Sequence, residues 1–247
     1  MYKETWKNYK ESFNFILPFI LVKVAFEIIV FILTENMVFH KFSFIGHERI
    51  LTGNFGVNSG IVAKYAIQIT FNLFIVSLFE VFLIVIMKAF LNKDDINYKE
   101  KFKESLGFYL RYLGLSIIIY AIILGVTLLG IFAFIVPFIA LLTIGLALYF
   151  EIVLMPCKSY LVYHDTTPEI ALEKGKEIGK KYLWKILLFI LVIGIIGALV
   201  DAYENINIYI YSLYDFVKVN VEIFLIMFML TICKKEDKKE ERVVEEY

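Results

Sequence analysis

Charged residues inside long apolar stretches are the features of this sequence best suited to chemistry. Lys23 and Glu27, like Lys218 and Glu222, stand four positions apart, a spacing that places both side chains on one face of a helix. A charge at the centre of a bilayer costs at least ~2.5–3.5 kcal/mol on insertion scales, so such groups usually face a bundle interior or water. The candidate intramembrane polar network comprises Lys23, Glu27, Glu80, Glu151, Asp215, Lys218 and Glu222.

Two interpretations of these charges are open. In the first, they form an interior network that fixes the register of the helices. In the second, they line a path or a pocket for an ion, a proton or a polar solute. Glu80 has no partner within its own stretch and could pair across helices with Lys23. Asp215 would instead be interfacial if the last span began near Phe216.

Membrane-spanning helices are the elements that would position these residues. Of the 247 residues, 60% are hydrophobic, against roughly 45–50% in an ordinary soluble domain. Runs of about 18 or more apolar residues indicate spans, and a helix satisfies its own backbone hydrogen bonds in lipid. The prediction is an all-α polytopic membrane protein with six transmembrane helices, at residues 13–33, 61–91, 107–134, 138–154, 183–200 and 206–233.

The distribution of lysine and arginine sets the orientation of these spans. The N-terminal segment, the loops after the second and fourth spans, and the tail are all rich in lysine. The loop after the first span carries only Lys41 and Arg49. Because positive charges stay on the cytoplasmic side, we expect a cell-membrane protein with both termini in the cytoplasm. The net charge of zero gives no case for binding nucleic acid.

Three cytoplasmic segments resemble one another. The sequences YKESFNFIL, FKESLGFYL and GKEIGKKYL begin at Tyr9, Phe102 and Gly175, and each precedes two apolar stretches. They suggest three repeat units, at residues 1–91, 92–163 and 164–235, each an amphipathic helix followed by a helical hairpin. Chance similarity among lysine-rich flanks is the alternative. Such helices could lie at the membrane interface and contact lipids, while residues 236–247 form a charged cytoplasmic tail.

Catalytic and metal-binding patterns are absent from the sequence. His40 and His47 fall in the predicted external loop and His164 in a cytoplasmic one, so they cannot converge on a metal. No zinc-protease, nucleophile-elbow or Walker pattern is present. Cys157 and Cys233 do not make a disulfide framework and are expected to be packing residues. We therefore expect no catalytic site, no cofactor and no metal.

The region around residues 160–189 carries a recognisable order of elements: the proline-bearing end of a span, an acidic residue, a proline, Ala-Leu, and a lysine-rich turn into an aromatic-led span. These are Pro156, Asp165, Pro168, Ala171-Leu172, Lys180-Lys181 and Tyr182-Leu183-Trp184-Lys185, with Gly175 where a serine is usual.

This order resembles the multi-pass membrane domain attached to some bacterial glycerophosphodiester phosphodiesterases, and its stand-alone prokaryotic relatives of unknown function. The resemblance implies a helical membrane domain. It implies no phosphodiesterase activity, because the soluble catalytic domain has no counterpart among these apolar stretches.

Two classes of function follow from the sequence. The first is a non-enzymatic scaffold or lipid-interacting protein, whose partners are membrane lipids and either a second copy or another membrane protein. The alternative is a small transporter or channel that uses the buried charges, as internal repeats and broken helices would suit. An intramembrane enzyme is the third and weakest option, since no nucleophile–base pair is present.

Overall fold

A computed structural model describes residues 1–35, 72–130, 137–201 and 208–245. Within these ranges the chain forms helices and short connections, and no strand. The prediction of an all-α protein is therefore confirmed for the described residues. The elements are α1 (Tyr2–Glu35), η1 (Asn72–Val76, a π-helical stretch), α4 (Ser77–Asn92), α5 (Tyr98–Leu129), α6 (Pro137–His164), α7 (Pro168–Lys181), α8 (Leu183–Asp201) and α9 (Ile208–Glu245).

Four described stretches are long and apolar enough to cross a membrane: Leu73–Asn92, Tyr98–Leu129, Leu141–His164 and Ser212–Asp237. They correspond to the second, third, fourth and sixth predicted spans. The first and fifth predicted spans are helical in α1 and α8, but in the described residues neither is among these four. His40, His47 and residues 61–71 of the second predicted span lie outside the described part of the chain.

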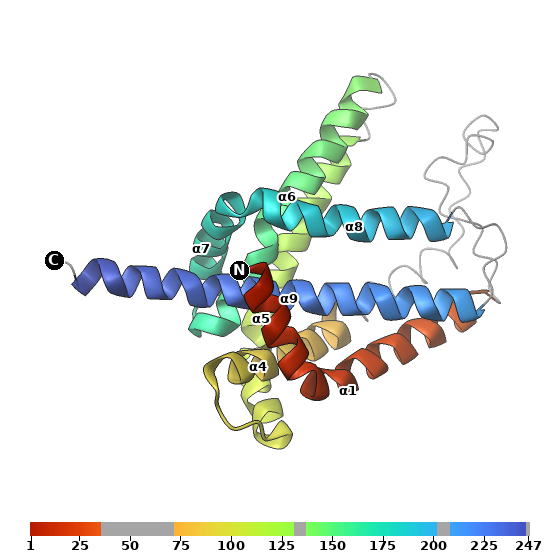
Figure 1. Cartoon of the computed structure of the whole chain (residues 1–247). Coiled ribbons are helices and arrows are strands. Elements are labelled where there is room, and N and C mark those ends of the chain that lie inside the picture. The colour runs from red at the N-terminus through yellow and green to blue at the C-terminus, as the bar shows by residue number, and fades with distance from the viewer. Residues whose placement is uncertain (36–71, 131–136, 202–207, 246–247) are drawn as a thin grey trace, which may run out of the picture.

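The predicted interfacial segments are built in two ways. In α1 and α5, each is continuous with the predicted span that follows it, so one helix contains both parts. Figure 1 shows that α1 changes direction along its length, and it contains Pro18, a residue that kinks helices by removing a backbone donor. The third, α7, is a separate helix before the fifth predicted span, with Thr167 at the predicted N-cap position and Pro168 in the first turn.

The core of the bundle is α4, which packs against α1, α5, α6 and α9. Its residues from Val81 to Met87 are almost entirely buried except Phe82. A helix that is apolar all round belongs inside a bundle, because no face of it can be left to water. This central position explains why a charge on α4 needs partners from its neighbours.

Two glycines of α7 allow it to lie directly on α6. A Cβ atom at Gly179 would lie 2.1 Å from the carbonyl oxygen of Val153, and one at Gly175 would lie 2.5 Å from the Cα of Cys157. Side chains therefore have no room at either position. This contact explains the glycine at position 175, and the four-residue spacing of the two glycines matches the small-residue pattern of close helix pairs.

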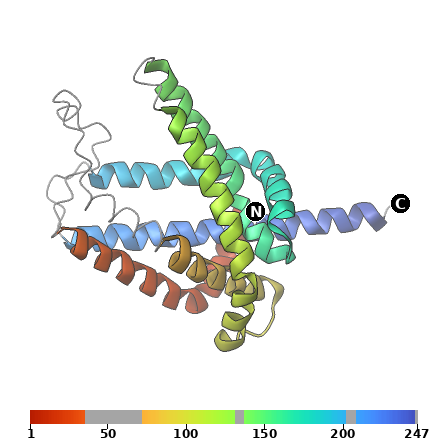
Figure 2. The same cartoon turned by 180° about the vertical axis from the view of Figure 1, so that it is seen from behind.

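The remaining helices extend away from this core. In both views α5 and α6 form a pair that projects from the bundle, whereas α8 and α9 run side by side (Figures 1 and 2). The C-terminal part of α9 reaches beyond the other helices in the same views. The sixth predicted span and the predicted tail are thus parts of one helix, which continues to Glu245.

Candidate functional site

Glu80 on α4 is held by side chains from two neighbouring helices. Its Oε2 atom accepts a hydrogen bond of 2.7 Å from the hydroxyl of Tyr112 on α5 and one of 3.1 Å from the ammonium of Lys158 on α6. The same ammonium lies 5.1 Å from the centre of the Tyr112 ring, within the range of a cation–π interaction. One carboxylate therefore connects α4, α5 and α6.

A second ion pair connects the first helix to the last. The ammonium of Lys23 on α1 lies 2.5 Å from Oε2 of Glu222 on α9, and both side chains are mostly buried. Nearby, the Tyr9 hydroxyl donates a 2.7 Å hydrogen bond to Oδ1 of Asn220. The Asn220 amide nitrogen donates in turn to the carbonyl of Phe216 at 2.6 Å. Polar contacts of this kind are strengthened by the low local dielectric of an apolar bundle.

The pairing differs from the predicted one in two respects. Glu222 pairs with Lys23 and not with Lys218, its neighbour on the same helix. Glu80 forms its ion pair with Lys158 and not with Lys23, although Lys23 is close enough to act on it electrostatically. Both differences have one cause. Spacing along a single helix identifies which face a charge occupies, but only the packing of helices determines which partner meets it.

The other predicted members of the network lie on α1, α6 and α9. Asp215 is buried in α9, about two turns after the helix begins, and so is not at an exposed helix end. Lys218 is half-buried on the same helix. Glu151 is exposed on α6, contrary to the expectation that such charges face the interior. Glu27 is in α1, but its side chain lies outside the described part of the structure.

Sequence reasoning missed Lys158 and Tyr112. The lysine distribution assigns Lys158 to the cytoplasmic loop after the fourth predicted span, although the sequence also predicts a continuation of that span past Pro156. In the structure α6 continues through Pro156 to His164, which leaves Lys158 inside the helix and facing Glu80. An apolar continuation after the proline was the available signal. Tyr112 carried none, since tyrosines are frequent throughout the chain.

A cluster of cations holds the C-terminal end of α6. Lys88 donates to the carbonyl of Val162 at 2.8 Å, and Arg111 contacts the Asp165 carboxylate at 2.7 Å and the Thr166 carbonyl at 3.1 Å. Carbonyl groups at a helix C-terminus lack partners within the helix and carry partial negative charge. These two cations satisfy that end of α6 where the chain turns into α7.

Tyr182, between α7 and α8, forms another contact with α9. Its hydroxyl donates a 2.8 Å hydrogen bond to Oε1 of Glu236, and the ammonium of Lys181 also bonds to that carboxylate. Burial, with the adjacent Glu236 charge and hydrogen bond, raises the pKa of Tyr182 to about 12.

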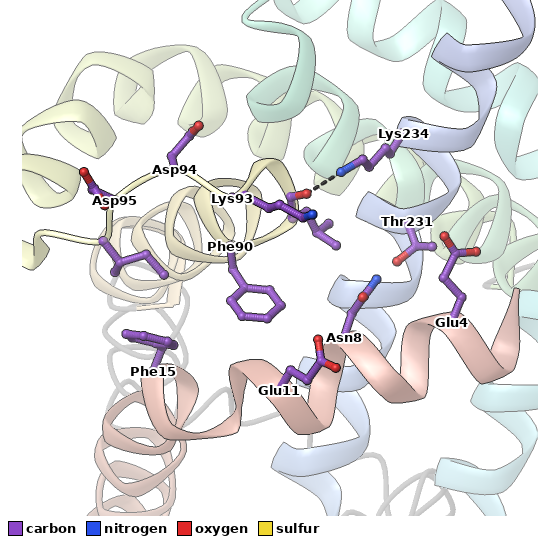
Figure 3. Close-up of a pocket in the computed structure, with 12 residues that line it drawn as sticks. Glu4, Asn8, Glu11, Phe15, Phe90, Lys93, Asp94, Asp95, Thr231 and Lys234 are labelled. Atoms are coloured by element: carbon purple, nitrogen blue, oxygen red, sulfur yellow. Dashed lines mark hydrogen bonds between the residues drawn. The ribbon is translucent and has the colours of Figure 1, made fainter.

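A groove of about 600 Å³ lies at the end of the bundle where α1, α4 and α9 meet. Figure 3 shows Phe90, Lys93, Asn8 and Glu11 around its middle, with Asp94 and Asp95 pointing away toward its outer edge. The lining residues are Glu4, Asn8, Glu11, Phe15, Phe90, Leu91, Lys93, Asp94, Asp95, Ile96, Thr231 and Lys234.

The described residues contain few of the side-chain groupings that bind metals or act as nucleophiles. No group of three or more His, Cys, Asp or Glu side chains within the described ranges could hold a metal ion. His164 contacts Asp237 through Nδ1 at 3.4 Å. Cys157 and Cys233 are both buried and unoxidised. The prominent polar features are therefore cross-links between helices and the groove at the end of the bundle.

Comparison with protein families, with curated proteins and with solved structures gives no match for the chain.

Proposed function

We propose that this chain is a non-enzymatic multi-pass membrane protein that acts as a scaffold or a lipid-interacting protein. Membrane lipids are its proposed partners, together with a second copy of the chain or another membrane protein. The resemblance of residues 160–189 to the membrane domain of glycerophosphodiester phosphodiesterases belongs to this proposal, which includes no phosphodiester hydrolysis.

The observation that supports this proposal is the ion pair between Glu80 and Lys158 inside the bundle. An ion path needs groups that exchange partners with the moving species, whereas this carboxylate is already held by Lys158 and Tyr112. Lys23 and Glu222 are paired in the same way. Fixed pairs between helices suit a protein whose task is to keep its shape in the membrane.

A small transporter or channel is the second candidate, and Glu151 is the observation that favours it. This carboxylate is exposed on α6, inside a stretch apolar enough to span the membrane. A charge there is costly unless it meets water, a cation or another protein. A water-filled path beside α6, within this chain or between two copies, would hydrate the Glu151 carboxylate.

Our proposed topology has six spans, three repeat units and both termini in the cytoplasm of the cell. Reporter fusions test the orientation. Alkaline phosphatase, which is active only outside the cytoplasm, should be active when fused after Asp201 and inactive when fused after Lys235. The reverse result would contradict the orientation, and equal activity at both sites would contradict a span between them.

Flux measurements separate the two functional candidates. The purified chain would be reconstituted into liposomes and screened with monovalent cations, protons and small polar solutes. The scaffold proposal expects no flux above that of empty liposomes. Flux that disappears in Glu151→Gln, while Glu173→Gln on the exposed face of α7 retains it, would replace the scaffold with a transporter. Flux in both variants would also contradict the scaffold.

A further inference from the structure

The groove at the end of the bundle combines charges of both signs with aromatic walls. Glu4 and Glu11 lie on its α1 wall, Asp94 and Asp95 lie at its outer edge, and the lining also carries the two ammonium groups of Lys93 and Lys234. Phe15 and Phe90 form part of its wall, with ring centres 6.3 Å apart. Ligand sites are typically concave and apolar with a few well-placed polar groups, and this groove has that composition.

One face of α1 supplies the first wall of the groove. Glu4, Asn8, Glu11 and Phe15 recur at spacings of four, three and four residues, so they form a single stripe along the helix. The adjacent face, which includes Tyr9 and Ile16, is buried against the bundle. The stripe is therefore held in a fixed orientation by the packing of the face beside it.

Lys93 supplies the opposite charge from the end of α4. Its backbone is left-handed, with φ of 62°, a conformation that glycine usually provides at helix ends. The backbone N–H groups of Lys93 and Asp94 donate hydrogen bonds to the carbonyls of Phe90 and Ala89, at 3.1 and 2.9 Å. This double closure holds Lys93 at the edge of the groove, where Figure 3 shows its side chain extending across it.

The other groove cation is already engaged. The Lys234 ammonium donates to the carbonyl of Leu91 (Figure 3), so it is less available to a ligand than Lys93. Glu11 forms only a loose contact with Lys7, at 3.8 Å between two largely exposed side chains, and such surface pairs contribute little. A ligand ammonium held in the groove can therefore take the place of Lys7 at the Glu11 carboxylate.

We propose that this groove binds the headgroup of a zwitterionic aminophospholipid. The primary ammonium of the headgroup is bound by Glu4 and Glu11, and its phosphate by Lys93. The glycerol and the first part of the acyl chains lie against Phe15 and Phe90. This assignment rests on the proposed function, because it specifies the lipid with which a lipid-interacting membrane protein would associate.

Charge and position both favour this occupant. An anionic lipid would bring its phosphate to a groove with excess negative charge, whereas a primary amine gains charge-assisted hydrogen bonds from the carboxylates. The groove lies beside Leu91 and Lys234, near the ends of two span-length helices. That is the depth of lipid headgroups in the proposed topology, and its aromatic wall suits an acyl-bearing molecule over a small soluble amine.

Native mass spectrometry of the detergent-purified full chain tests the proposal. The lipids would be phosphatidylethanolamine, its trimethylated analogue phosphatidylcholine, and phosphatidylglycerol, with identical acyl chains. The wild-type chain should bind phosphatidylethanolamine about tenfold more tightly than phosphatidylglycerol, a ratio that one charge-assisted contact can supply. Phosphatidylcholine, which lacks ammonium hydrogens, should fall between them.

Variants identify the groove as the origin of this preference. The double variant Glu4→Gln/Glu11→Gln should bind phosphatidylethanolamine and phosphatidylglycerol equally, and Lys93→Gln should weaken both zwitterionic lipids. Glu173→Gln removes an exposed carboxylate from α7 and should behave as wild type. Equal wild-type affinities, or a preference that survives in the double variant, would overturn the proposal. If the reconstituted chain shows no flux and no headgroup preference, only the lipid-site proposal is contradicted. If it shows flux, the scaffold function is contradicted.

Discussion

Glu80 on α4 and Lys158 on α6 form an ion pair of 3.1 Å, although 78 positions separate them in the sequence. The pair sits at the centre of the bundle, where α4 contacts every other span-length helix. The residues next to Glu80 on α4 carry no positive charge, so the cation that neutralises its carboxylate comes from another helix.

Removing either charge of this pair should destabilise the fold more than removing both. Lys158→Met leaves the Glu80 carboxylate without its cation and should cost about 1–3 kcal/mol of unfolding free energy. The double variant Glu80→Gln/Lys158→Met should recover part of that loss, because an unpaired buried charge is worse than a neutral pair. Denaturation in mild detergent measures the free energy of unfolding of the wild type, of each single variant and of the double variant. Additive losses would show that the two groups do not interact.

The Lys23–Glu222 pair should tolerate exchange of its charges. Lys23→Glu alone places two carboxylates together and should weaken the contact between α1 and α9. Combining it with Glu222→Lys restores opposite charges, and we expect recovery of about 0.5–3 kcal/mol, the range found for coupled neighbours. Lys218→Glu with Glu222→Lys provides the comparison, because the structure does not pair those two residues with each other. Rescue by that second pair and not the first would contradict the assignment.

A methyl group at Gly179 should separate α7 from α6. The Cβ of alanine would lie 2.1 Å from the Val153 carbonyl oxygen, so the backbone must move, and overpacking of this kind typically costs about 1–3 kcal/mol. Gly194→Ala on α8 is the matched control, since a Cβ there meets no atom within 4 Å. It should be neutral or stabilise by up to about 1 kcal/mol through helix propensity. Thermal unfolding compares the two, and equal effects would refute the close packing of α7.

The contact between Tyr182 and Glu236 should weaken in alkali. The pKa of Tyr182 is raised to about 12 from its usual 10.0, first by burial and then by Glu236. Between these values the unfolded chain releases the proton before the folded chain does, so stability falls as the pH rises from about 10 to about 12. Tyr182→Phe should remove this part of the pH dependence. Tyrosinate absorbance should show one fewer late-titrating group in the variant, and an unchanged titration would contradict the shift.

The sequence predicted the helical class and four helices long and apolar enough to span a membrane, because long hydrophobic runs indicate such helices. It also placed Pro168 in the first turn of α7 and Lys23, Glu80 and Glu222 in ion pairs between helices or within them. It also predicted that the fourth span continues past Pro156, as α6 does, but it could not predict that Glu80 meets Lys158. That pairing depends on how helices pack around one another, and a single helix face is compatible with several partners.

The groove was equally hidden from sequence reasoning. Its α1 stripe of Glu4, Asn8 and Glu11 reads as an ordinary solvated face, and Lys93 as one of several loop lysines. Only the meeting of α1, α4 and α9 brings them together. Lys93 stands at the end of α4, where helices often have glycine. This unusual placement can be recognised only once the end of α4 is known.

The contact between Lys23 and Glu222 also has a consequence for biosynthesis. The two residues are 199 positions apart, so at about 5–20 residues per second roughly 10–40 s of translation separate them. During that interval α1 carries Lys23 without Glu222, the partner that joins it to α9. Assembly is therefore completed only by the arrival of α9, and a chain that stops before it should be left with an open, protease-sensitive first helix.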